Sequence, residues 1–143
     1  MHPQLLRITN GLLVLSYIFF LQFSDKPAME YILSICLLIT ICVSQIFWNN
    51  PVRYSIIHKI DGVIAKCSIL LFIGYILCYK KMDICMMYAF MLIITWMIYF
   101  FILSNHYSSR EWCCDKHIIY HGMSHILCFA GSLYAFLPGF SYK

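Results

Sequence analysis

Three histidines recur at four-residue intervals near the end of this 143-residue chain, at His117, His121 and His125. Side chains four residues apart share one face of a helix, so the three imidazoles would form a row. A helix that offers two imidazoles at i and i+4 is a common source of zinc ligands. We therefore predict that His121 and His125 bind Zn²⁺. The alternative is that the two rings only form hydrogen bonds to neighbouring helices.

A catalytic zinc ion has three protein ligands and one open position, and two more histidines are candidates for the third ligand. His58 lies three residues before Asp61 and would share its helical face. His117 extends the row of His121 and His125. The ordinary alternatives are a solvated loop position for His58 and an interfacial position for His117, so the third ligand is left open.

Asp61 and Ser44 are the candidate catalytic residues. Asp61 stands where the chain re-enters an apolar stretch, and it could accept the proton of a metal-bound water. It could equally be a first-turn carboxylate that the helix dipole favours. Ser44 lies late in the preceding apolar segment, where a serine usually returns its hydroxyl to a backbone carbonyl. Ser44 is therefore a catalytic candidate only because we expect it to lie near Asp61 and the histidines.

The composition places these residues in a membrane protein. Hydrophobic residues make up 62% of the chain and charged residues only 11%, whereas about a quarter of a soluble domain is charged. The apolar excess predicts lipid-facing surface, and the lipid bilayer is the first expected partner. The net charge of +4 is spread along the chain, so we expect no nucleic-acid partner.

Five segments are long and apolar enough to cross a bilayer, which takes about 20 residues. Short connections between them predict a single domain over residues 1–143, an all-α, multi-pass helical bundle. Lys66 falls within the third segment and could extend toward the membrane surface. The predicted segments are 5–23, 29–48, 61–79, 83–104 and 117–137.

Antiparallel spans gather the candidate residues at one end of the bundle. Odd-numbered spans begin, and even-numbered spans end, on the same side of the membrane. Ser44, His58, Asp61 and His121 all fall on that side, whichever way the protein is oriented. The charged residues near the opposite end are expected to be ordinary loop residues. The compartment and the oligomeric state are not specified by this pattern.

This arrangement resembles the CREST superfamily, which includes alkaline ceramidases, the progestin and adiponectin receptors and the hemolysin III relatives. The residues that carry the resemblance are Ser44, Asp61-Gly62, and His121-Gly-Met-Ser-His125 followed by Ala130-Gly131-Ser132. The resemblance implies a zinc site within the membrane and hydrolysis of lipid amide bonds. It also implies that Ser44 stabilises the oxyanion, that Asp61 handles the proton of the water, and that His121 and His125 bind zinc.

The sequence departs from the family pattern in two respects. The family has a histidine four residues after the serine, whereas this chain has Trp48, which cannot bind zinc. The family also has seven spans rather than five. Either His58 or His117 replaces the missing ligand, or the site holds no metal.

Three functions are consistent with these residues. The first is a zinc-dependent hydrolase that acts on a membrane lipid amide or ester. The second is a non-catalytic membrane protein that acts through protein interactions and retains a degenerate metal site. The third is bis-histidine haem binding between the third and fifth spans.

Overall fold

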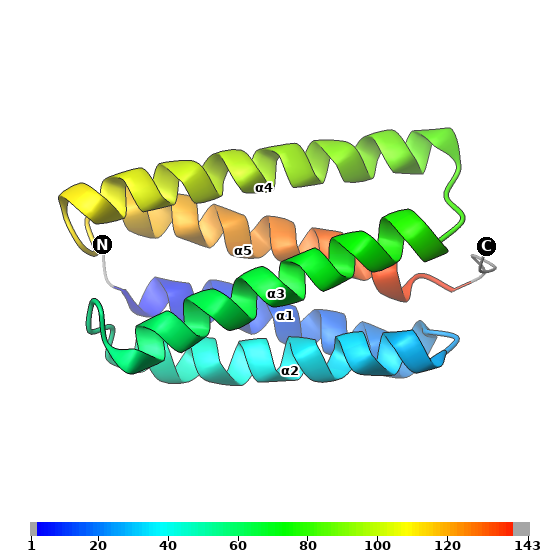
Figure 1. The fold of residues 1–143 in the computed structure, drawn as a ribbon, viewed down its shortest axis with the longest axis horizontal. Coiled ribbons are helices and arrows are strands. Elements are labelled where there is room, and N and C mark those ends of the chain that lie inside the picture. The colour runs from blue at the N-terminus through cyan, green and yellow to red at the C-terminus, as the bar shows by residue number, and fades with distance from the viewer. Residues whose placement is uncertain (1–2, 139–143) are drawn as a thin grey trace.

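The computed structural model describes residues 3–138 and consists of five helices joined by short connections (Figure 1). No strand occurs among these residues, so the prediction of an all-α bundle is confirmed. The helices are α1 (Gln4–Phe23), α2 (Ala28–Asn49), α3 (Ile56–Tyr79), α4 (Ile84–Arg110) and α5 (Asp115–Phe136).

Two helix ends differ from the predicted span boundaries, because hydropathy marks only the apolar part of a helix. α3 begins at Ile56, five residues before the predicted start, and Ser55 caps it: the Ser55 hydroxyl accepts a hydrogen bond from the backbone N–H of His58 at 3.1 Å. α4 continues six residues beyond Ser104, to Arg110. His58 therefore lies within a helix rather than in a connection, and Asp61 lies in the second turn rather than at the start.

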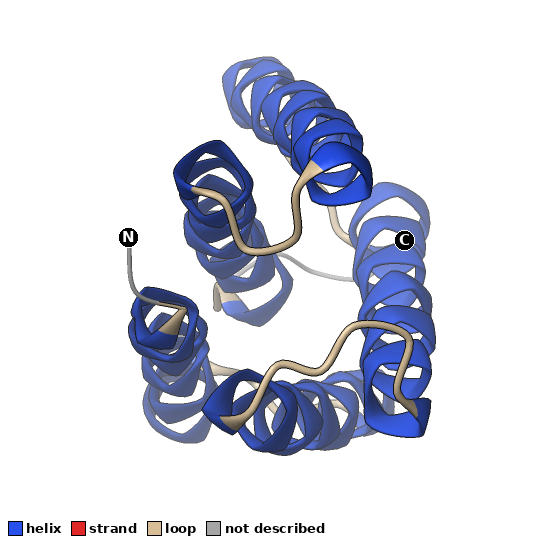
Figure 2. Ribbon diagram, turned by 90° about the vertical axis from the view of Figure 1, so that its left-hand side faces the viewer, coloured by secondary structure: helices blue, strands red, loops and turns tan. Residues whose placement is uncertain are grey.

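Viewed end-on, the helices form an arc in the order α4, α5, α1, α2, α3 (Figure 2). Each helix packs against its neighbours in this order, and α3 also makes a smaller contact with α5. The two ends of the arc, α3 and α4, pack little against each other although they are consecutive in the chain. Figure 1 shows that they separate progressively toward the end where α3 begins.

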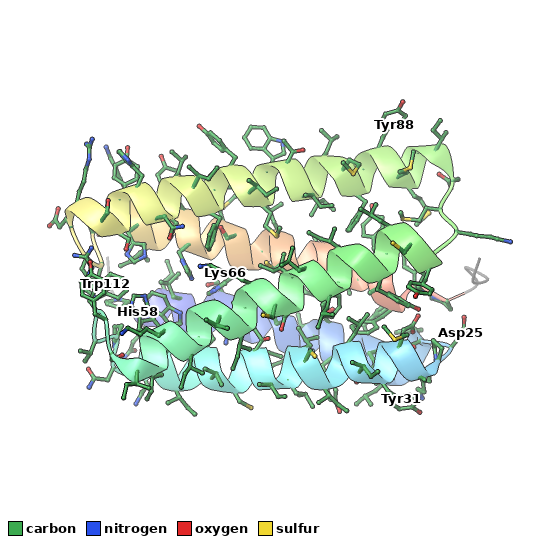
Figure 3. All side chains as sticks on the ribbon, viewed as in Figure 1. Asp25, Tyr31, His58, Lys66, Tyr88 and Trp112 are labelled. Carbon is green, nitrogen blue, oxygen red and sulfur yellow. The ribbon has the colours of Figure 1, made fainter. Side chains whose placement is uncertain are left out.

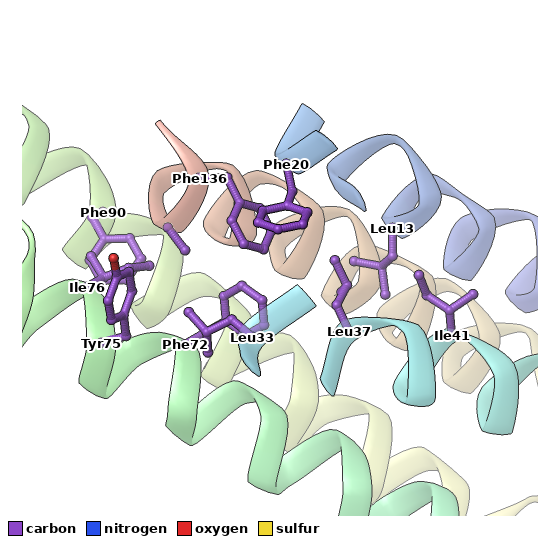
Figure 4. Close-up of a cluster of buried hydrophobic side chains, with 11 residues drawn as sticks. Leu13, Phe20, Leu33, Leu37, Ile41, Phe72, Tyr75, Ile76, Phe90 and Phe136 are labelled. Carbon is purple, nitrogen blue, oxygen red and sulfur yellow. The ribbon is translucent and has the colours of Figure 1, made fainter. Parts of the chain in front are cut away.

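An aromatic and aliphatic core fills the opposite half of the bundle (Figure 4). The ring of Phe136 on α5 lies 5.1 Å from that of Phe20 on α1 and 5.6 Å from that of Phe72 on α3, measured between centroids. Leu33 and Leu37 of α2 are buried in the same cluster. With Phe90 of α4 in the same cluster, the core joins all five helices where α3 approaches the rest of the bundle.

A buried ion pair reinforces this end. The ammonium of Lys80 lies 2.8 Å from a carboxylate oxygen of Glu30, and both side chains are almost fully buried. Tyr75 donates a second hydrogen bond to the same oxygen at 2.8 Å, and the Ser24 hydroxyl donates to the other. Lys80 also donates to the carbonyl of Leu137 at 2.9 Å. The expectation that charged residues here are ordinary loop residues is therefore wrong for Glu30 and Lys80.

Four helices, α1 to α4, are long and apolar enough to cross a membrane, which supports a multi-pass membrane protein. α5 is not among them, because it carries Asp115, Lys116 and three histidines. It nevertheless runs alongside both α1 and α4 in the bundle (Figure 1). The crossing of the membrane by α5 therefore stays a prediction.

Candidate intramembrane site

A cavity of about 390 Å³ lies on the inner side of the arc, bounded mainly by α3, α4 and α5. Because α3 and α4 pack little against each other, the cavity opens between them. Its walls are largely aliphatic and aromatic. Its lining includes four of the six residues singled out from the sequence, which are Ser44, Asp61, His121 and His125.

Ser44 and Asp61 form a polar pair where α2 packs against α3. Both side chains are buried, and the Ser44 hydroxyl lies close enough to the Asp61 carboxylate to interact with it. The early start of α3 at Ile56 makes this contact possible, because it carries Asp61 into the bundle. The serine hydroxyl therefore faces the carboxylate of another helix.

The imidazoles of His121 and His125 lie side by side on α5, with ring centroids 4.8 Å apart. The hydroxyl of Thr9 on α1 lies 2.9 Å from Nδ1 of His125 and 3.2 Å from the carbonyl of Leu6. In the tautomer in which Nδ1 of His125 donates to Thr9 and Thr9 donates to Leu6, the Nε2 atom of His125 keeps its lone pair. Nδ1 of His121 lies 3.1 Å from the hydroxyl of Ser104 on α4. Hydroxyls on two other helices thus orient the two rings.

His58 and His117 do not line the cavity and have a different hydrogen-bonding role. Nδ1 of His58 accepts from the backbone N–H of Tyr54 at 3.0 Å, and Nδ1 of His117 accepts from that of Cys113 at 3.2 Å. In a neutral ring the proton is then on Nε2, which is a donor and not a metal ligand. Figure 3 shows His58 beside Trp112 at the end of the bundle.

Trp48 occupies the position where the resemblance implies a zinc ligand. Its indole is buried and lies edge-on to His121, with ring centroids 5.1 Å apart. The indole also stacks on Trp112 at 6.2 Å. Among the described residues, the indole Nε1 of Trp48 is the one buried side-chain nitrogen or oxygen without a hydrogen-bond partner. A hydrogen-bond donor thus stands beside the two histidines where a lone pair would be required.

The donor set does not fit a catalytic zinc site with three protein ligands. Residues 3–138 contain no group of three or more His, Cys, Asp or Glu side chains placed to hold a metal ion. His121 and His125 can each offer a lone pair, whereas both candidates for the third ligand use Nδ1 to accept from the backbone. The assignment of Zn²⁺ to His121 and His125 therefore stays a prediction.

Sequence reasoning missed the partners of the two histidines, Thr9 and Ser104. Both are polar residues in predicted spans, at the start of the first and the end of the fourth. The rule that gathers the candidate residues at one end of the bundle also places these two hydroxyls there. Hydroxyl groups are frequent partners of buried imidazoles, so the same rule extended to serine and threonine would have predicted these two contacts.

Comparisons of the chain with protein-family models, with curated proteins and with solved structures find no match. The resemblance to the CREST superfamily therefore stays a hypothesis. The structure supports a broader class, a membrane-type helical bundle with a largely apolar cavity between its helices.

Proposed function

We propose that this protein binds the acyl chain of a membrane lipid in the cavity between α3 and α4. The observation that carries the proposal is an apolar cavity whose inner lining has a few convergent polar groups, the usual composition of a small-molecule site. Ser44 and Asp61 come from α2 and α3, and His121 and His125 come from α5. The volume of about 390 Å³ suits one chain better than two.

The opening and the lining explain how such a ligand would bind. A lipid can enter sideways from the bilayer between α3 and α4, without crossing an aqueous phase. Its chain would contact aliphatic and aromatic side chains such as Ile94, Met97 and Phe101. Polar groups of the ligand would meet polar side chains of the lining, whose hydrogen bonds need partners once water is excluded.

Filling the cavity tests the proposal. Ala65 lines the cavity, and Ala65→Trp would occupy part of it with an indole. Cys67 lies two residues further on α3, is exposed and is not part of the lining, so Cys67→Trp is a matched control. We expect the wild type and Cys67→Trp to retain about one lipid per chain after extensive detergent washing, counted by mass spectrometry. Ala65→Trp should retain several-fold less, and equal retention in all three proteins would refute the proposal.

A second candidate function is hydrolysis of a lipid amide or ester, favoured by the proximity of Ser44 and Asp61 in the same cavity as His121 and His125. In this candidate, Ser44 would donate to the oxyanion and Asp61 would accept a proton from the attacking water. Zinc chemistry would belong to His121 and His125. Among residues 3–138, no third protein ligand is placed beside these two histidines.

Two measurements together test the hydrolase candidate, the zinc content of the purified protein and its hydrolytic activity. Elemental analysis of the purified protein should give about one zinc per chain if the hydrolase is real, and the double variant His121→Ala/His125→Ala should lose it. Release of fatty acid from a ceramide or a monoacyl ester should fall at least a hundred-fold in Asp61→Asn. Absence of both zinc and hydrolysis from the wild type would leave lipid binding as the function.

A further inference from the structure

Lys66 is an unusual residue in the middle of a membrane-type helix. It lies ten residues after the start of α3, about 15 Å along the helix axis. It belongs to the cavity lining, where it is the only Lys or Arg among the described residues. Figure 3 shows it on the central part of α3, on the side toward α4.

The rest of the cavity leaves the ammonium of Lys66 without an ionic partner among the described residues. Asp61 is the acidic residue of the lining, but it lies five residues away on the same helix, which turns its side chain about 140° around the axis. Asp61 also interacts with the hydroxyl of Ser44. An unpaired cation within a span is costly and marks a functional site. To reach the membrane surface, the side chain of Lys66 would have to extend along about half the length of α3.

We propose that the lipid bound in the cavity is a single-chain lipid with an anionic headgroup, whose carboxylate or phosphate pairs with Lys66. This inference rests on the proposed function and specifies its ligand. The apolar lining holds the chain, and the ammonium at the opening supplies the opposite charge. Lys66 is exposed at the edge of the lining, where the bound chain and the surrounding lipid would exclude water. A charged hydrogen bond in such a low-dielectric setting is stronger than one in water, so the headgroup charge decides which lipids bind well.

The test compares lipids that differ in headgroup charge but share one chain. Palmitate carries a carboxylate, 1-palmitoyl lysophosphatidate carries a phosphate, and 1-hexadecanol is the uncharged reference. Binding to the full-length, delipidated protein is measured in a neutral detergent. We expect the wild type to bind at least one of the two anions roughly ten-fold or more tightly than hexadecanol. The anion preferred identifies the source of the headgroup.

Three variants connect this preference to Lys66. Lys66→Met keeps the length and apolar stem of the side chain without its charge, and should bring the ratio of affinities close to one. Lys66→Arg should retain the preference. Lys59→Met makes the same substitution at a lysine of α3 that is likewise exposed but does not line the cavity, and should behave as the wild type.

The outcomes separate the two proposals. Equal affinity of the wild type for the anions and for hexadecanol would overturn the assignment of charge selectivity but leave lipid binding intact. A preference unchanged in Lys66→Met would overturn the role of Lys66. Failure of the wild type to bind any of the three lipids would overturn this inference and the proposed function together.

Discussion

The ion pair between Glu30 and Lys80 permits a quantitative test of how the bundle is held together. Lys80→Met removes the ammonium that faces the buried carboxylate of Glu30 and leaves the hydrogen bonds from Tyr75 and Ser24. Removing one partner of a buried ion pair costs about 3–5 kcal/mol. For a chain of this size, a loss of this magnitude lowers the melting temperature on the order of 10 °C.

The double variant Glu30→Gln/Lys80→Met should recover much of this loss. A glutamine oxygen still accepts the hydrogen bond from Tyr75, and no charge stays buried. Neutral replacement of both partners often has little effect on stability, so we expect a net loss of about 1–2 kcal/mol. Lys81→Met, at the exposed neighbouring position, is the control and should change little.

The assay is unfolding in detergent, followed by circular dichroism and by intrinsic tryptophan fluorescence. The fluorescence is informative because Trp48 and Trp112 lie near the opposite end of the bundle, so a change there reports global unfolding. The reasoning would be refuted if Lys80→Met were as stable as the wild type. It would also be refuted if the double variant lost as much stability as the two single variants added together.

Three further substitutions test the site itself. Trp48→Phe should change stability by no more than about 1 kcal/mol, because it removes an unpaired buried N–H as well as some packing. Trp112→Phe should lose a further ~1 kcal/mol, because it breaks the hydrogen bond to the carbonyl of Pro51; equal stability of the two variants would contradict this. Thr9→Val should cost about 1–3 kcal/mol, because Nδ1 of His125 loses its hydrogen-bond partner. A neutral effect in unfolding measurements would show that this bond does not fix the ring.

Hydropathy predicts the number and order of the helices, because each long apolar segment forms one helix. It does not predict the helix ends, because polar turns continue a helix without a hydropathy signal. Ser55 begins α3 by capping, five residues before the apolar segment. The capping residue thus decides that Asp61 faces Ser44 within the bundle rather than the aqueous surface.

The convergence of Ser44, Asp61, His121 and His125 on one cavity was accessible from the sequence, since it requires only antiparallel spans and helical spacing. The sequence could not show that His58 and His117 lie outside this cavity. Their placement depends on backbone N–H groups in two connections, at Tyr54 and Cys113, and both residues have positive φ angles. No span-counting rule predicts such local geometry.

The pairing of Glu30 with Lys80 was also not accessible from the sequence. Hydropathy places each residue at a helix end, where a charged side chain is normally solvated. The contact arises because α3 leans over the end of α2 and because the carbonyl of Leu137 meets the same ammonium. The same inclination of α3 separates it from α4 at the other end, which opens the cavity.

Photo-crosslinking tests the central claim, a lipid chain within the cavity, most directly. The full-length protein is labelled in vesicles with a palmitate analogue that carries a diazirine on its chain, and the labelled peptides are mapped by mass spectrometry. We predict that excess unlabelled palmitate suppresses labelling of the cavity residues Met97 and Leu127, while Leu92 and Trp96 on the exposed face of α4 keep theirs. Equal suppression, or labelling confined to the exposed faces, would contradict the account.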